Sequence, residues 1–176
     1  MTDQELKDLV AENTKGLAEL RTSQAKTDTQ IKSLGKRFWE FGNSRGQEVE
    51  DFFYRYFHRN RRLPGVEFDR VERNMITTDG QEHDIILING QSSALISVKH
   101  KLHKKDIDSI VNDEMPRMKY FLRGVGSTHR LYGWVASFVV SDAVQRYAQE
   151  QGLYVLTRSG ENTLVLNDAD FQAQEF

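Results

Sequence analysis

The sequence has 176 residues, a formal net charge of −2 and no cysteine. That length suits one hydrophobic core with an appendage and is short for two complete domains. The lack of cysteine excludes disulfides, thiolate zinc ligands and cysteine nucleophiles, and it favours an intracellular protein. With so small a net charge, any affinity for nucleic acid has to come from local basic patches.

The N-terminus does not resemble a targeting segment. The first residues, MTDQELKDLV, are acidic and lack an apolar stretch, whereas a secretory signal has a basic start and an apolar core. No apolar run approaches the roughly 18 residues that a membrane-spanning helix needs. We therefore expect an unprocessed, cytoplasmic protein that does not enter a membrane.

Residues 6–41 carry an apolar heptad pattern. One core position holds Val10, Leu17, Ile31 and Phe38, and the other holds Leu6, Leu20, Leu34 and Phe41. Asn13, Gln24 and Thr27 occupy the same seam, which lowers stability but restricts register and oligomer number. We predict that residues 1–42 form a coiled-coil helix that joins copies of the chain. A helix folded back on its own domain is the alternative, since periodicity alone does not separate the two.

A second helix is predicted to begin near Arg45. Glycine and small polar residues at positions 42–46 interrupt the heptad pattern there. The next apolar residues fall on one helix face, which indicates packing on a core. They are Val49, Phe52, Phe53, Tyr56 and Phe57. Glu50 lies at the edge of that face, where a helix meets a sheet, and Asp51 is expected to point to solvent.

The remaining chain reads as strands alternating with helices. After a turn at Pro64–Gly65, strands are predicted in VEFDRVERNMI, HDIILING and SALISVKH, with a hairpin at Asn89–Gly90. A helix over residues 104–122, kinked or restarted at Pro116, leads to a strand at 132–140. A helix capped by Ser141 and two more strands, GLYVL and NTLVL, complete the chain. This order predicts an α/β domain with a mixed sheet covered by helices.

Strand alternation groups several polar residues. Glu82 and Asp84 share one face of the second strand, and Ser97 and Lys99 share one face of the third. If the hairpin aligns these faces, Asp84, Ser97 and Lys99 converge, with Glu50 approaching from the helix. Charges gathered at the end of an apolar sheet should pair, bind a metal or lie in a cleft. A simple ion pair between Asp84 and Lys99 is the plainest alternative.

Three short motifs carry a resemblance to a known family. The helix motif GxxxE ending at Glu50, the strand HDIIL with Asp84, and the strand ALISVKHKL with Lys99 resemble the motifs of the PD-(D/E)xK nuclease superfamily. The element order over residues 45–140 also resembles its αβββαβ core. The heptad helix ahead of it is similar to that of uncharacterised prokaryotic proteins of the DUF3782 type. The resemblance implies a restriction-endonuclease-like fold for residues 43–176.

The resemblance also implies a metal-dependent hydrolysis of phosphodiester bonds in DNA, by an endo- or exodeoxyribonuclease. Asp84 and Glu50 would be ligands of Mg²⁺ or Mn²⁺, and Lys99 would orient or polarise the attacking water. The chain departs from the family pattern because Ser97 stands where an acid is expected, and a hydroxyl is a weaker ligand than a carboxylate. Glu82 or Glu50 could supply the missing charge, with Ser97 as a further ligand. The alternative is an inactive domain that serves as an oligomeric module binding nucleic acid or protein.

Two basic stretches suggest a partner that carries phosphates. Arg55, Arg59, Arg61 and Arg62 follow Glu50, and Lys101, Lys104 and Lys105 follow Lys99. We predict that both flank one cleft and bind the backbone of a nucleic acid, most simply DNA. Basic helix ends that only aid solubility are the alternative. His100 and His103 are read as surface residues rather than zinc ligands, since the chain has no cysteine and only five histidines.

Overall fold

The computed structural model describes residues 2–176, without the side chains of Leu9 and of residues 37–43. It divides into two compact units, Met1–Ser44 and Arg45–Phe176. Helix α1, Asp3–Asn60, belongs to both, so the predicted restart of the helix near Arg45 is wrong. A glycine inside a helix costs only about 1 kcal/mol. Because helix extension is cooperative, good helix formers on both sides outweigh that loss.

The apolar stripe of the first unit is exposed. Its described apolar residues are Leu6, Val10, Leu17, Leu20, Ile31 and Leu34, each 45–67% exposed. Phe38 and Phe41, which the heptad pattern adds, lie among the residues whose side chains are not described. In the described part of the chain, no helix combines the length and the apolar character that crossing a membrane would require.

The second unit is built on a six-stranded sheet in the order β3-β4-β5-β6-β7-β8. The strands are β3 Arg70–Ile76, β4 Glu82–Ile88, β5 Ser92–Lys101, β6 Arg130–Val139, β7 Tyr154–Ser159 and β8 Asn162–Val165. β3, β4 and β5 are antiparallel, β5, β6 and β7 are parallel, and β8 returns antiparallel to β7. The predicted α/β fold with a mixed sheet is therefore confirmed.

The strand predicted in VEFDRVERNMI is divided into β2, Val66–Glu67, and β3, and a further short strand, β1, Arg62–Leu63, precedes it. β1 pairs with β2 around the predicted turn at Pro64–Gly65. Gly65 has a φ of 77°, a left-handed conformation that glycine adopts without strain. Phe68, which follows β2, is buried in the core, and its N–H donates to the Arg61 carbonyl at 2.8 Å.

The predicted helix over 104–122 consists of three parts: α2 Lys104–Ser109, the π-helical turn η1 Ile110–Glu114, and α3 Met115–Gly124. Pro116 explains the change, because its ring clashes with the carbonyl one turn earlier and it has no N–H to donate. The preceding turn widens, and the Met115 N–H donates to the Ile110 carbonyl, five residues back. Helix α4, Asp142–Glu150, follows β6 with Ser141 at its N-cap position.

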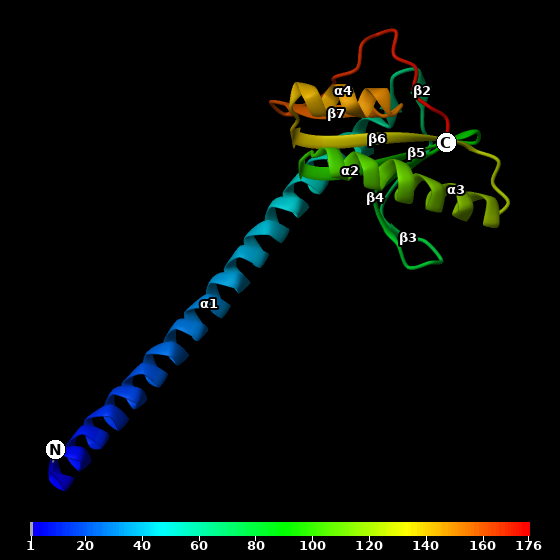
Figure 1. Ribbon diagram of the computed structural model, residues 1–176. Helices are drawn as coiled ribbons and strands as arrows, with labels where there is room; N and C mark the ends of the chain where they lie inside the picture. The colour runs from blue at the N-terminus through cyan, green and yellow to red at the C-terminus, as the bar shows by residue number, and fades with distance from the viewer. Residues whose placement is uncertain (1) are drawn as a thin grey trace. The chain divides into compact units, whose positions relative to one another are not determined.

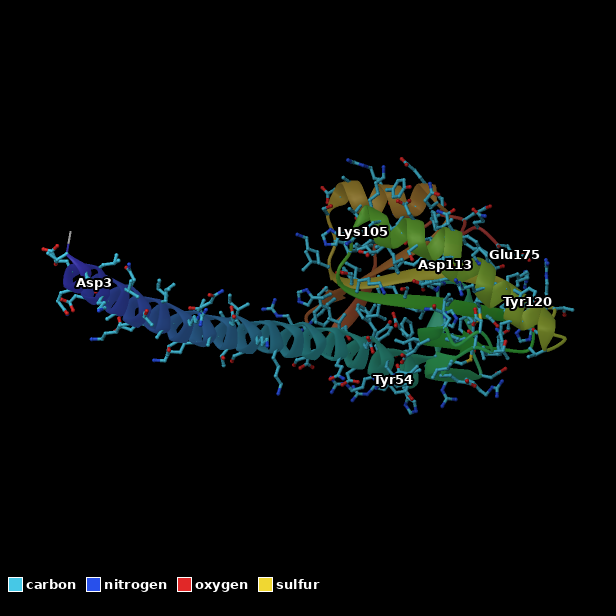
Figure 2. The ribbon with its side chains drawn as sticks, turned by 60° about the horizontal axis from the view of Figure 1, so that its bottom comes forward. Asp3, Tyr54, Lys105, Asp113, Tyr120 and Glu175 are labelled. Atoms are coloured by element: carbon cyan, nitrogen blue, oxygen red, sulfur yellow. The ribbon has the colours of Figure 1, made fainter. Side chains whose placement is uncertain are left out.

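Helices cover both faces of the sheet. Val49, Phe53 and Phe57 of α1 form one core with residues such as Ile85 and Ile96. A second core on the other face joins residues of α2, η1, α3 and α4 to the sheet. In Figure 1, α2, α3 and α4 lie along the sheet. In Figure 2, Lys105, Asp113 and Tyr120 mark successive points of that helical layer, and Tyr54 marks α1.

Gly133 lets the second core close. A Cβ at this position of β6 would clash with Leu153 Cδ2 and lie 3.2 Å from the Met115 sulfur. Both neighbours are fully buried. The absence of a side chain therefore allows α3 and the start of β7 to pack directly on the central strand.

Candidate metal and catalytic site

Asp84 sits where β4 and β5 stop pairing. Both strands extend further, β4 back to Glu82 and β5 on to Lys101, but the pairing between them ends at Ile85 and Ile96. Beyond that point the Val98 N–H donates to Asp84 Oδ2 at 2.6 Å instead of to a backbone carbonyl. The Asp84 carboxylate thus accepts a backbone hydrogen bond at the point where the two strands separate.

Lys99 and Ser97 lie beside this carboxylate, as the strand alternation predicts. Lys99 Nζ is 3.8 Å from Asp84 Oδ2, an ion pair in which both side chains keep partial access to water. Ser97 is 2% exposed, and its hydroxyl has no partner at full hydrogen-bond geometry in the described part of the chain. A buried hydroxyl without a partner is unusual, because leaving it unsatisfied costs about 1–3 kcal/mol.

Glu114, which the sequence reading missed, completes the group from the second helical layer. It is the last residue of the π-helical turn. Burial raises the pKa of its carboxyl, and the negative charge of Asp84 raises it further, while Lys99 and the Ser97 hydroxyl lower it. The Ser97 hydroxyl therefore lies close enough to act on this carboxyl, although the contact falls short of full hydrogen-bond geometry. Glu114 thus supplies a carboxyl group next to Ser97, which stands at the position where an acid was expected.

Glu50 approaches from α1, on the other face of the sheet. Burial raises the pKa of its carboxyl, Asp84 and Glu82 raise it further, and Arg73 and Lys99 oppose the rise. Glu82 itself is exposed. Asp84 and Lys99 thus act on two half-buried glutamates, one from each helical layer.

Three ion pairs hold the elements around this group. Asp51 Oδ1 accepts from Arg73 at 2.7 Å and joins α1 to β3, so Asp51 does not simply point to solvent as expected. Arg117 donates to Asp113 at 2.7 Å and to Asp79 at 3.1 Å, joining α3 to the turn before β4. A hydrogen bond from Thr77, with help from Arg117, holds the pKa of Asp79 at about 2.

The two predicted basic stretches lie at different places. Lys101, Lys104 and Lys105 are exposed where β5 ends and α2 begins, next to Lys99. The end of α1 instead lies near the start of β5, since Leu63 and Ala94 line one cavity. The stretches therefore do not flank one cleft.

The arginines of the first stretch make local contacts. Arg55 donates to the Asp51 carbonyl, Arg61 to the Asp69 carbonyl, and Arg62 pairs with Glu67. Arg59 is exposed on the last turn of α1.

A cation that the sequence reading missed lies near Lys101. Arg158 of β7 stands over the rings of Phe52 and Phe138 at 5.1 and 5.2 Å. The His100 ring also lies against Phe138, and His100 is exposed, as predicted. Basic side chains thus gather where the parallel strands β5 and β7 end.

The donors in this group suit a hard divalent cation. Among the described residues, no three acidic or histidine side chains lie close enough together to enclose a metal ion. Mg²⁺, however, usually keeps several waters and takes only one or two carboxylates. Asp84 and Glu114 are oxygen donors of that kind, and the unpartnered Ser97 hydroxyl lies between the same elements. The residues present therefore fit a partly hydrated Mg²⁺ or Mn²⁺.

Comparison with known proteins finds structural likeness only at a remote level. No protein-family model and no curated protein matches the chain, so the resemblance to DUF3782-type proteins has no such support. Among solved structures, the chain is similar to the small subunit of a heterodimeric restriction endonuclease, at 14% identity and a TM-score of 0.40. The match covers 62% of this chain and 62% of that subunit's length.

Proposed function

We propose that residues 45–176 form a metal-dependent nuclease that hydrolyses phosphodiester bonds in DNA, as an endo- or exodeoxyribonuclease. The observation that carries this proposal is the meeting of Glu114 with Asp84, Ser97 and Lys99 at the fork between β4 and β5. Partly buried acids whose pKa is raised, beside a lysine, are typical of functional sites. The short motifs that resemble the PD-(D/E)xK superfamily support the same reaction.

Each residue has a role that follows from its place. Asp84 and Glu114 would hold Mg²⁺ or Mn²⁺, with Ser97 as a neutral third donor and Glu50 facing the same group from α1. The cation, when bound, would offset the negative charge that grows on the phosphate oxygens. Lys99, ion-paired with Asp84, would orient the attacking water and add a second positive charge.

The exposed lysines next to the site suit the DNA backbone. Lys101, Lys104 and Lys105 project from the end of β5 and the start of α2, and Arg158 lies on the nearby end of β7. Contacts to phosphates release counterions, so binding should weaken steeply as salt is raised. Arg55, Arg59, Arg61 and Arg62 would contribute at most to a distant part of the same nucleic acid.

Cleavage of plasmid and single-stranded DNA with Mg²⁺, Mn²⁺ or chelator tests this function. We expect metal-dependent cleavage that falls by about a hundredfold or more in Lys99→Ala, as on losing a group that stabilises transition-state charge. Lys119→Ala on α3 is the matched control. The metal should also raise the melting temperature of the wild type, and Glu114→Gln, but not Glu150→Gln, should lose this rise. Equal cleavage by Lys99→Ala would overturn the proposal.

The second candidate function is an oligomeric module, and the exposed stripe of α1 supports it. Six apolar side chains at heptad spacing, 45–67% exposed, form a surface that a second helix of the same kind can cover. We propose that α1 joins copies of the chain whether or not the site cleaves DNA. Salt-dependent DNA binding without metal-dependent cleavage or stabilisation would make the whole protein an inactive binding module.

A further inference from the structure

We infer that α1 pairs with a second copy of this chain in antiparallel orientation, with Leu17 facing Leu20 of the second copy. The inference rests on the self-association proposed above and does not depend on nuclease activity. It names the partner surface, its register and its direction. Each of these can be tested separately.

The surface to be covered is long and narrow. From Leu6 to Leu34, the exposed apolar residues span about 42 Å of helix at a rise of 1.5 Å per residue. Three exposed polar residues, Asn13, Gln24 and Thr27, lie in the same stripe. A second helix that covers the stripe must also place these polar side chains opposite acceptable neighbours.

One antiparallel register places the two amides of the seam opposite each other and its central leucines opposite each other. In antiparallel pairs, each layer joins one core position of the first helix to the other core position of the second. With Leu17 opposite Leu20, Asn13 falls opposite Gln24, where the two amides can exchange hydrogen bonds. The remaining layers join Leu6 to Ile31, Val10 to Thr27 and, at the end of the stripe, Leu34 to Asp3.

Neighbouring antiparallel registers are poorer. Sliding one helix by a heptad in either direction places Asn13 opposite Leu17 or Ile31. An amide side chain would then be buried against an aliphatic one without a hydrogen-bond partner. The polar residues of the seam therefore select one register out of three.

Charge complementarity separates the antiparallel from the parallel orientation. In a parallel pair in register, each polar residue of the seam would face the same residue of the second copy. The seam alone therefore does not decide between the two orientations. In that pair the flanking contacts join Gly16 to Arg21 and Ser23 to Asp28, with no pair of opposite charges. In the antiparallel register Lys7 lies near Asp28 of the second copy, and the symmetry makes this ion pair twice.

Lys7 is available for this contact. Its ammonium bonds Asp3 of its own helix at 2.9 Å, and the side chain remains 69% exposed. One ammonium can donate three hydrogen bonds, so a second carboxylate can join the first. The small residues Gly16 and Ser23 meet on the opposite flank, where they let the helices approach closely.

The lack of cysteine allows a direct test by disulfide cross-linking of the full chain. Asn13→Cys and Gln24→Cys are made singly, mixed under reducing conditions so that subunits exchange, and then oxidised. We expect a cross-linked dimer from the mixture and none from either variant alone, since only facing thiols come within bonding distance. Lys15→Cys, on the outer face of the helix, is the control and should not cross-link.

The other outcomes overturn the inference in distinguishable ways. Cross-linking of each variant with itself shows a parallel pair, and a dimer without a cross-link in the mixture shows another register. A monomer by light scattering shows that self-association fails altogether, and it leaves the nuclease proposal standing. As a second readout, Lys7→Glu should raise the dissociation constant roughly five- to tenfold, and adding Asp28→Lys should restore it.

Discussion

The two ends of α1 follow the same helical backbone but differ in what their apolar faces meet. Near the C-terminal end, Phe53 and Phe57 are fully buried against the sheet, whereas Leu17 and Leu20 near the N-terminal end are 57% and 67% exposed. Apolar burial, not helix propensity, supplies most of a helix's stability in a protein. The comparison therefore teaches that one end of the helix is stabilised by its own chain, whereas the apolar stripe of the other end stays exposed to solvent among the described residues.

Truncating one apolar residue at each end of α1 should give the largest difference in stability between two variants. We expect Phe53→Ala to lower the free energy of unfolding by about 3–5 kcal/mol, because it opens a cavity in a packed core. Leu20→Ala should leave the unfolding of the second unit unchanged and weaken self-association instead. Urea denaturation followed by tryptophan fluorescence, at several protein concentrations, measures both. Equal losses from the two variants would mean that the exposed stripe is packed in the monomer.

Substituting one glycine in each unit should change stability in opposite directions. Gly133→Ala forces a methyl group against Leu153 and Met115, and we expect it to destabilise the protein by about 1–3 kcal/mol. Gly35 of α1 has no atom within 4 Å of an added Cβ, so Gly35→Ala should favour the helix by about 0.5–1 kcal/mol. Thermal denaturation for the first variant and far-UV circular dichroism for the second would show these effects.

The smallest expected effect concerns charge. Because burial and Asp84 raise the pKa of Glu114, its ionisation opposes folding, and wild-type stability falls as the pH rises through that pKa. Without metal, Glu114→Gln should melt above the wild type at pH 7, and the difference should disappear below the ordinary pKa of 4.5. Glu19→Gln, on the exposed part of α1, should show no such pH dependence. A lower melting temperature for Glu114→Gln at pH 7 would contradict this reading.

The fold was accessible from the sequence because hydrophobic periodicity marks long elements strongly. The alternation in HDIILING and SALISVKH placed Asp84, Ser97 and Lys99 on common faces, and the pairing of Ile86 with Leu95 confirms the alignment. The helix break near Arg45 was predicted wrongly, because glycine is a weak breaker inside a long cooperative helix.

Glu114 escaped the sequence reading for a physical reason. It lies fifteen residues after Lys99 in sequence, in a turn whose π-helical winding rotates every side chain away from its α-helical direction. Pro116, two residues later, was the available signal, since it indicated a local distortion of the helix. A serine at the expected acid position, together with an acid two residues before a proline inside a predicted helix, would have led to Glu114.

The hydrogen bond between Val98 and Asp84 has a practical consequence. Because a backbone N–H of the central sheet is tied to the carboxylate proposed as a ligand, whatever binds Asp84 also changes the surroundings of that amide. The Val98 amide resonance should therefore report occupancy of the site by NMR, without substrate and without turnover. The fold thus contains an intrinsic probe that separates loss of binding from loss of reaction.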